Sequence, residues 1–327
     1  MDELLEQRKI EQVWVAHWAG TETPTAVNWA YEPGLPWTLA ANTPLYFSQI
    51  TTAGLVYVID RAGNNFFSYN LNTKQWTKLA SPNYSGVEVY RTLAFSPNGL
   101  TIACISEGGV AVPLGRRIEV YTIATNAWAA SSQAPNLGAD TSNLKSLVWA
   151  ADNDTIWAWA HESSQILRGQ CIRYVVSTNT WTAFASNTGI LTAFQGPGCA
   201  INAAGTVIYG SRIGSSGVTV MTYTIATDAY ADWGTAAPAG TNFGFGDDPD
   251  KLWYFNTTTY RKGYLKISDA SSNPNIFPEN TLRTASYGVT FGISDDLAEI
   301  IEHARSTSPQ VMTNRGSTIE QLGGSLF

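Results

Sequence analysis

Apolar and polar residues alternate in short runs along this chain, and one such run recurs in close copies. The clearest copy is residues 121–128 (YTIATNAW), and its relatives are residues 69–76 (YNLNTKQW), 174–181 (YVVSTNTW) and 223–230 (YTIATDAY). Alternation with a period of two predicts a strand, because it places the apolar side chains on one face of a sheet. The Thr-Asn, Thr-Asp or Thr-Lys pair then favours a tight turn, and the closing aromatic residue begins the next strand. Each copy is therefore predicted to be a β-hairpin.

The hairpin forms the second half of a longer unit. Ahead of it we expect a first strand that ends in a tight turn and a second strand rich in β-branched and aromatic residues. Residues 93–99 (LAFSPNG) and 100–105 (LTIACI) show both parts. The units recur roughly every 50 residues, and a unit of this size cannot bury its own faces alone. Their recurrence predicts a solenoid or a closed ring of sheets.

We predict a single all-β domain, a β-propeller of seven blades, with a six-bladed ring as the alternative. Seven second strands can be counted against six clear first strands, because the unit that begins near residue 12 lacks its own. We therefore expect a terminal strand to close the ring, with residues 318–327 the preferred donor and residues 1–11 the second. Closure removes the exposed sheet edges that a solenoid would have to cap. Residues 1–11 are then an N-terminal arm and residues 12–327 the propeller.

Two stretches carry a resemblance to known repeat families. Residues 69–79 (YNLNTKQWTKL) resemble the second half of a kelch repeat, and residues 93–99 are similar to the strand and turn of WD-repeat propellers. The chain departs from the kelch pattern after the second strand, where Asp60-Arg61 and His161-Glu162 replace the diagnostic double glycine. The resemblance implies a kelch-like propeller fold, which does not by itself imply a function.

The charge of the chain excludes several classes of partner. Charged residues make up 14% of the chain, against roughly 25% in typical soluble domains. The formal net charge is −7, and no basic cluster is larger than Arg116-Arg117 or Arg261-Lys262. We therefore exclude nucleic acid as a partner, because binding it requires a basic surface. No run of about 18 apolar residues is present, so no membrane span is expected.

The spacing of the cysteines and the absence of common catalytic motifs argue against enzymatic activity. Cys104, Cys171 and Cys199 lack CxxC spacing, and we predict buried free thiols that act as small hydrophobic side chains. No Walker loop, GxSxG elbow, HExxH motif or cysteine–histidine pairing is present. We therefore expect no cofactor, no metal and no enzymatic activity.

Acidic residues gather in a few short segments, which hold Asp152/Asp154, Asp247/Asp248/Asp250 and Asp295/Asp296. Taken singly, such a cluster could be a carboxylate pair for hydrolysis or a calcium site. In register, however, all three occupy the turn between the first and second strands, where Asp caps local backbone N–H groups. We predict that Asp152, Asp248 and Asp295 bond to local backbone and hold no metal.

Polar residues end the predicted second strands and define a candidate rim for ligand binding. The rim comprises His17, Trp18, Asp60, His161, Arg212, Asn256 and His303. We expect His17 and His303 to be neighbours across the ring closure, where imidazoles could bind a ligand. The competing interpretation is that strand ends at solvent are simply polar. The other tryptophans, such as Trp157 and Trp159, are predicted to fill the space between sheets.

The first eleven residues differ from the rest in being densely charged. Apart from Met1, their only large apolar residues are Leu4, Leu5 and Ile10, and these three form one stripe if the arm is helical. So short an arm cannot fold alone. We predict that these three side chains contact another chain of an assembly.

The composition resembles that of virion components of tailed bacteriophages, being poor in charge and rich in Thr, Ser, Asn and Ala, without a signal peptide. That resemblance implies a non-enzymatic structural protein of the virion, in the tail or attached to the capsid. Its partners would be other protein chains, including symmetric copies of itself. The alternatives are a carbohydrate-binding propeller that recognises surface glycans, or a glycan hydrolase or lyase. A cytoplasmic or non-classically exported location is the alternative to the virion.

Overall fold

The computed structural model describes twenty-five strands and one short 3₁₀ helix, η1 (Ile225–Thr227). The described residues are 14–17, 29–31, 36, 45–48, 51, 53–60, 65–83, 90–107, 116–135, 143–161, 169–186, 199–214, 217–237, 241–245, 250–256, 262–268, 272–274, 290–293, 299–304 and 310–312. Within these ranges, no helix has both the length and the apolar character needed to cross a membrane.

Three sheets from the first half of the chain each contain four antiparallel strands. Sheet I contains β3 (Leu45–Phe47), β4 (Leu55–Asp60), β5 (Phe66–Asn70) and β6 (Gln75–Lys78). Sheet II contains β7 (Tyr90–Phe95), β8 (Thr101–Glu107), β9 (Arg116–Thr122) and β10 (Ala127–Ala130). Sheet III contains β11 (Asn143–Trp149), β12 (Thr155–His161), β13 (Gly169–Val175) and β14 (Thr180–Ser186).

Two further sheets repeat this order, and a last one joins the two ends of the chain. Sheet IV contains β15 (Ala200–Ile201), β16 (Val207–Gly214), β17 (Gly217–Thr224) and β18 (Ala229–Ala237). Sheet V contains β19 (Thr241–Phe245), β20 (Lys251–Asn256), β21 (Lys262–Lys266) and β22 (Ser272–Pro274). Sheet VI contains β23 (Thr290–Ile293), β24 (Glu299–Ala304), β1 (Trp14–His17) and β2 (Trp29–Tyr31), with β25 (Gln310–Met312) also paired to β24.

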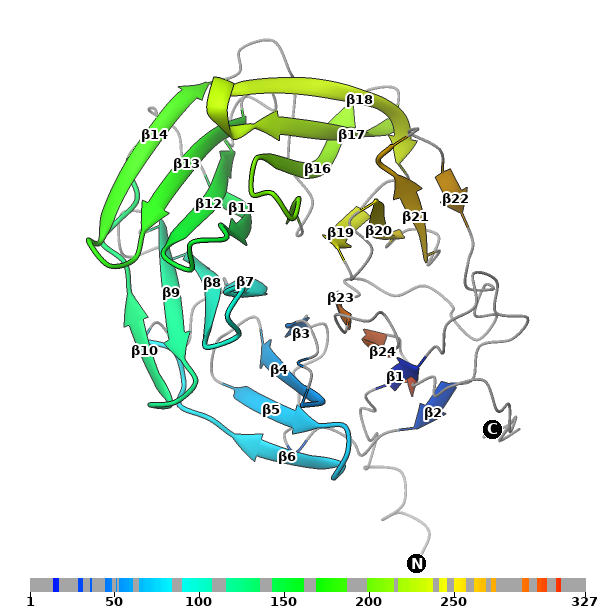
Figure 1. Cartoon of the computed structure of the whole chain (residues 1–327). Coiled ribbons are helices and arrows are strands. Elements are labelled where there is room, and N and C mark those ends of the chain that lie inside the picture. The colour runs from blue at the N-terminus through cyan, green and yellow to red at the C-terminus, as the bar shows by residue number, and fades with distance from the viewer. Residues whose placement is uncertain are drawn as a thin grey trace, which may run out of the picture.

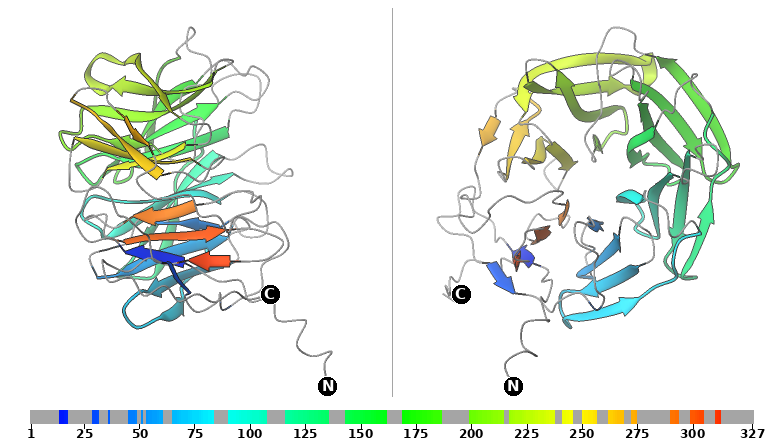
Figure 2. Two further views of the ribbon diagram at one scale, coloured as in Figure 1. Left: turned by 90° about the vertical axis from the view of Figure 1, so that its right-hand side faces the viewer. Right: turned by 180° about the vertical axis from the view of Figure 1, so that it is seen from behind.

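The sheets stand around a common axis (Figure 1). In sheet III, for example, β11 lies nearest the centre and β14 on the outer rim, and β7 and β10 have the same places in sheet II. The view from behind shows the same ring (Figure 2). The all-β prediction is confirmed, and the predicted hairpins are the third and fourth strands of sheets I to IV.

A terminal strand closes the ring, as predicted, but by a different route. β1 pairs antiparallel with β24, with Trp14 opposite Glu302 and His17 opposite Glu299, and Figure 2 shows this strand beside those of the C-terminal segment. The segments that we counted as the first and seventh units are thus two halves of sheet VI. The described strands form six sheets, so the count of seven is not confirmed. Residues 1–11 and 318–327 lie outside the described residues.

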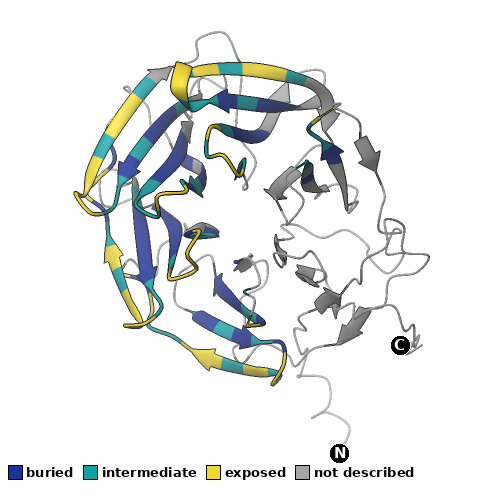
Figure 3. Cartoon of the chain, viewed as in Figure 1, coloured by how far each residue is buried: buried dark blue, intermediate teal, exposed yellow. Residues whose placement is uncertain are grey.

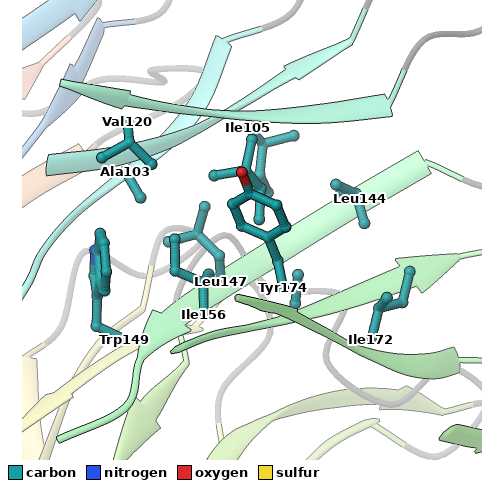
Figure 4. Packing of buried hydrophobic residues seen from close by; sticks show 11 residues of the cluster. Ala103, Ile105, Val120, Leu144, Leu147, Trp149, Ile156, Ile172 and Tyr174 are labelled. Atoms are coloured by element: carbon teal, nitrogen blue, oxygen red, sulfur yellow. The ribbon is translucent and has the colours of Figure 1, made fainter. Parts of the chain in front are cut away.

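The core lies between neighbouring sheets, and Figure 3 shows buried residues on the inner strands and exposed residues on the outermost strands and turns. Between sheets II and III, Ile105, Ile118 and Val120 pack against Leu144 and Tyr174, among other residues (Figure 4). Each buried aliphatic side chain of this kind contributes about 1.5–3 kcal/mol. This double-sided packing explains why second strands such as β12 are almost continuously hydrophobic, since both of their faces are covered.

The next interface shows the opposite face of β12. Trp157 and Trp159 pack with Cys171 against Ile208, Met221 and Tyr223 between sheets III and IV. Trp157 is 5% exposed and Trp159 is 1% exposed, which confirms the predicted core tryptophans. The three cysteines are also confirmed as buried and free.

Candidate functional site: the turn face

At one end of sheets I to IV, tight turns join the strands in the described residues. In an antiparallel four-stranded sheet, the turn between strands one and two and the turn between strands three and four lie at the same end. We call these paired turns in sheets I to V the turn face. In every one of these sheets a backbone N–H of the second turn donates to a carbonyl of the first: Leu71 to Gly54 (2.8 Å), Ile123 to Leu100 (3.1 Å), Val176 to Asp154 (2.8 Å), Ile225 to Thr206 (3.0 Å) and Ile267 to Asp250 (2.8 Å).

Carboxylates strengthen this connection in sheets III and V. In sheet III, Asp154 accepts hydrogen bonds from the backbone N–H and the hydroxyl of Ser177, at 2.7 and 2.6 Å. Asp250 accepts the same two bonds from Ser268, at 2.7 and 2.8 Å. Both carboxylates are thus used within their own sheet, which favours a structural role over a catalytic or calcium-binding one.

Asp152 caps its own turn, as the sequence predicted. Its carboxylate accepts bonds from the N–H of Asp154 (3.0 Å), the N–H of Thr155 (2.8 Å) and the Thr155 hydroxyl (2.7 Å). Burial alone would raise the pKa of Asp152, but these hydrogen bonds outweigh it and lower the pKa below its ordinary value. Asp248 and Asp295 lie outside the described residues, so their bonding stays a prediction.

In sheets II and III the repeated motif also forms hydrogen bonds to the preceding sheet. In sheet II, Asn126 Oδ1 accepts the Ala80 N–H at 2.8 Å, and Trp128 Nε1 donates to the Ala80 carbonyl at 2.7 Å. In sheet III, Asn179 Oδ1 accepts the Ser132 N–H at 2.7 Å, and Trp181 Nε1 donates to the Ser132 carbonyl at 3.0 Å. We call these two pairs of bonds the clasps.

A tyrosine holds each clasp asparagine in place. Tyr121 donates its hydroxyl hydrogen to Asn126 Oδ1 at 2.8 Å, and Tyr174 donates to Asn179 Oδ1 at 3.1 Å. In sheet IV the equivalent bond runs from the Tyr223 hydroxyl to Asp228 Oδ1, at 2.8 Å. The sequence motif Tyr-x4-Asn/Asp is therefore a hydrogen-bonded unit as well as a turn signal.

Backbone geometry explains why the turn residue is Asn or Asp. Asn126, Asn179 and Asp228 have φ values of 50°, 52° and 50°. L-residues with a Cβ avoid this left-handed region, but Asn and Asp tolerate it better than most. Sheet I carries Lys74 at the same place, with φ 60°.

A second connection joins sheets II and III nearer the axis. Trp149 Nε1 donates to the Ala94 carbonyl at 3.0 Å. Asn153 Oδ1, on another residue with positive φ, accepts the Asn98 N–H at 2.7 Å. Sheets I to III are therefore linked to one another by hydrogen bonds at this end, and the surface there consists of hydrogen-bonded turns.

The fully exposed residues of the turn face in sheets I to IV are mostly small or uncharged. Its exposed residues in sheets I to IV are Ala53, Asn72, Thr73, Pro97, Asn98, Gly99, Leu100, Ala124, Thr125, Asn126, Ala151, Asp152, Ser177, Thr178, Asn179, Ala203, Ala204, Thr206, Ala226 and Thr227. Asp152 is the one charged residue among them, and its carboxylate is already bonded within its turn. The same turns also hold Lys74, Asp154, Asp228 and Asp250, which are half-buried. Leu100 is 62% exposed, the one mostly exposed large hydrophobic side chain in the described part of the chain.

The other end of the sheets also carries charged residues. The segments that join second to third strands contain or adjoin Arg61, Glu107, Arg116, Glu162, Arg168 and Arg261. Three of the predicted rim residues, Asp60, His161 and Asn256, end second strands at this end. Asp60 is 3% exposed and accepts a 2.6 Å bond from the Asn65 amide, so it holds its own loop together.

The remaining rim residues do not form one group. His303 lies within β24, and Arg212 lies within β16 rather than at its end. His17 ends β1, which is a third strand, so it lies at the turn-face end of sheet VI. Its partner in register is Glu299, whereas His303 pairs with Thr290 and Val311. The expected His17–His303 neighbourhood is therefore wrong, because adjacent strands in this sheet run in opposite directions.

Several predicted residues cannot be placed. Trp18, Leu4, Leu5 and Ile10 lie outside the described residues. Across the described ranges, no three His, Cys, Asp or Glu side chains gather as metal ligands would. The sequence analysis did not predict the clasps. The recurrence of Asn and Trp at fixed positions of the motif was a signal for them, because strand formation alone does not require these residue types.

Comparison with known proteins shows the fold. No protein-family profile matches the sequence, and no curated protein matches it. The chain is similar to a chain of a structure titled as a nidogen/laminin complex, with a TM-score of 0.55 and 9% identity, over 81% of this chain and 92% of that one. It is similar also to a putative TolB from Agrobacterium tumefaciens, with a TM-score of 0.57 and 9% identity, over 89% of this chain and 96% of that one. Both are propellers, so the chain has the β-propeller fold, while the kelch-like label stays a prediction.

Proposed function

We propose that this protein is a non-enzymatic interaction propeller that works as a structural component of a tailed-bacteriophage virion, in the tail or attached to the capsid. The turn face is the observation that supports it best. Its turns are fixed by hydrogen bonds within and between sheets, and most of its fully exposed residues in sheets I to IV are small and uncharged. A rigid surface loses little conformational entropy when a partner binds, so more of the contact energy remains for affinity.

Two further observations agree with this proposal. The carboxylates of Asp152, Asp154 and Asp250 are bonded to their own turns, so they are not available as a catalytic pair. One of the similar structures is a complex of two proteins, nidogen and laminin, and protein chains are the partners that we propose here. The carbohydrate-binding alternative has less support, because the rings of Trp128 and Trp181 pack against Tyr121 and Tyr174, with centroids 5.1 and 4.7 Å apart, which leaves less ring surface for a sugar to stack on.

Particle composition tests the proposal. Phage particles released from the source organism would be purified on a density gradient and analysed by quantitative mass spectrometry. We expect this chain at a fixed copy number per particle and expect deletion of residues 2–11 to abolish incorporation while the isolated ring melts as before. Particles that lack the chain, or a purified chain that binds a defined glycan at micromolar concentration, would contradict it.

A further inference from the structure

One edge of β24 is shared by two strands that come from opposite ends of the chain. On this edge β1 pairs with residues 299–302 and β25 pairs with residues 302–304, while β23 covers the opposite edge. Figure 2 shows β1 and β25 end to end in one row beside β24. Glu302 is the partner of Trp14 in one register and of Met312 in the other. The third-strand position of sheet VI is therefore filled in part by each end of the chain.

The two strands run in the same direction, because both are antiparallel to β24. Each strand, if extended, would therefore grow into the place of the other. Continued in the register of β1, residues 12–14 would lie opposite the residues 302–304 that β25 faces. Residues 12–14 read QVW and residues 310–312 read QVM. In either case the same positions of β24 would meet a Gln, a Val and a large apolar residue.

We propose that residues 302–304 of β24 are an acceptor site for a strand, at which residues 12–14 and β25 exchange. The free edge of a strand binds any extended segment of suitable sequence through its main-chain N–H and C=O groups. β25 has the advantage of a short connection, since only residues 305–309 separate it from β24. Residues 12–14 need no long loop either, because β1 already lies on the same edge. The two occupants are therefore close in free energy, and the minor one is populated.

The exchange releases the C-terminal end of the chain without opening the ring. Residues 305–327 leave the sheet when residues 12–14 enter it, whereas β1 keeps its register with β24 in both arrangements. The released segment is then available to another chain. This exchange does not depend on the proposed role in a virion.

Oxidative cross-linking of the full chain in dilute solution tests the exchange. Gln12→Cys paired with Ala304→Cys, and Val13→Cys paired with His303→Cys, report the minor arrangement; two adjacent pairs are needed because one of them is the closer kind. The native cysteines are buried, so they compete little for the oxidant. If the minor arrangement holds about 10% of the molecules or less, Val311→Asp should raise the rate of both cross-links about tenfold or more, because it weakens the competing strand.

Ala16→Cys paired with Ile300→Cys is the matched control, since these residues are partners in both arrangements. Its cross-linking rate should not change with Val311→Asp, which separates exchange from a general loosening of sheet VI. Val13→Asp and Val311→Asp should each lower the Tm slightly, and together they should lower it by more than the sum, because each removes the substitute for the other.

The exchange would be overturned if neither N-terminal pair cross-links in the Val311→Asp background, if the two Tm losses simply add, or if the cross-links join two chains rather than one. A chain that passes these tests but is absent from phage particles would remove the proposed function alone.

Discussion

The clasp asparagine offers the sharpest test of how this ring is held together. Asn179 has two roles, because its side-chain oxygen accepts the Ser132 N–H and the Tyr174 hydroxyl, and its backbone occupies the left-handed region at φ 52°. Substitutions can separate these roles. Asn179→Asp keeps both, Asn179→Gly keeps only the backbone conformation, and Asn179→Ala keeps neither.

The expected magnitudes follow from the two roles. Each lost hydrogen bond costs about 0.5–1.5 kcal/mol, and the lower part of that range applies to the exposed Ser132 bond. A Cβ in the left-handed region costs about 1–2 kcal/mol. We therefore expect the free energy of unfolding to fall by about 1–2 kcal/mol in the glycine variant and by about 2–4 kcal/mol in the alanine variant. The aspartate variant should stay within about 0.5 kcal/mol of the wild type at pH 7.

Urea unfolding followed by tryptophan fluorescence measures this series, and the same three substitutions at Asn126 provide a replicate in sheet II. The order should be wild type and aspartate, then glycine, then alanine. Equal losses in the glycine and alanine variants would show that backbone strain has no part. A loss in the aspartate variant as large as in alanine would refute the role of the side-chain oxygen as a shared acceptor.

Three other predictions concern pH, the thiols and the closure of the ring. Because the folded pKa of Asp152 lies below its ordinary value of about 3.9, the stabilisation by the ionised carboxylate is complete above that value and is lost as the pH falls through the folded pKa. The difference in unfolding free energy between the wild type and Asp152→Asn should therefore hold from pH 7 to about 5 and shrink in urea titrations at lower pH. Burial raises the pKa of Cys199 to about 12, so a thiol reagent at pH 8 should label the folded chain slowly. In urea the same reagent should label all three cysteines rapidly. Fast labelling of the folded protein would contradict the burial of the thiols. A pair of cysteines substituted for Ala16 and Ile300, or for the adjacent Val15 and Ile301, should cross-link on oxidation, since each pair lies opposite in register. In antiparallel strands neighbouring opposite pairs alternate between a shorter and a longer Cα–Cα distance, so one of the two pairs is the closer. A mass spectrum without either cross-link would exclude this closure.

The sequence predicted the parts of the fold that depend on local patterning. Alternation and turn residues were sufficient for the hairpins that end at Trp76, Trp128 and Trp181, and the hydrophobic second strand 155–161 correctly indicated burial on both faces. The role of Asp152 was also predictable, because Asp in a tight turn bonds to nearby N–H groups whatever the fold.

Long-range pairing was not predictable in the same way. Nothing near His17 reveals that its strand pairs with residues 299–302, so one sheet was counted as two units and His17 was assigned to the wrong end of the sheets. The clasps depend on the position of the preceding sheet, which the motif does not encode by itself. The turn face emerged only when turns distant in sequence were seen to lie at the same end of the ring.

The pairing of β1 with β24 has a consequence for how the chain folds. Sheet VI cannot form until β24 has been synthesised, so β1 and β2 must wait for it while the five intervening sheets are made. Closing a loop of this length from an unfolded chain would cost on the order of 5 kcal/mol of entropy. Once the five intervening sheets have folded, however, they hold β1 and β24 near each other, so most of this loop-closure entropy has already been lost. Sheet VI should therefore form last, and a nascent chain truncated before β24 would carry an unpaired N-terminal hairpin exposed to other chains.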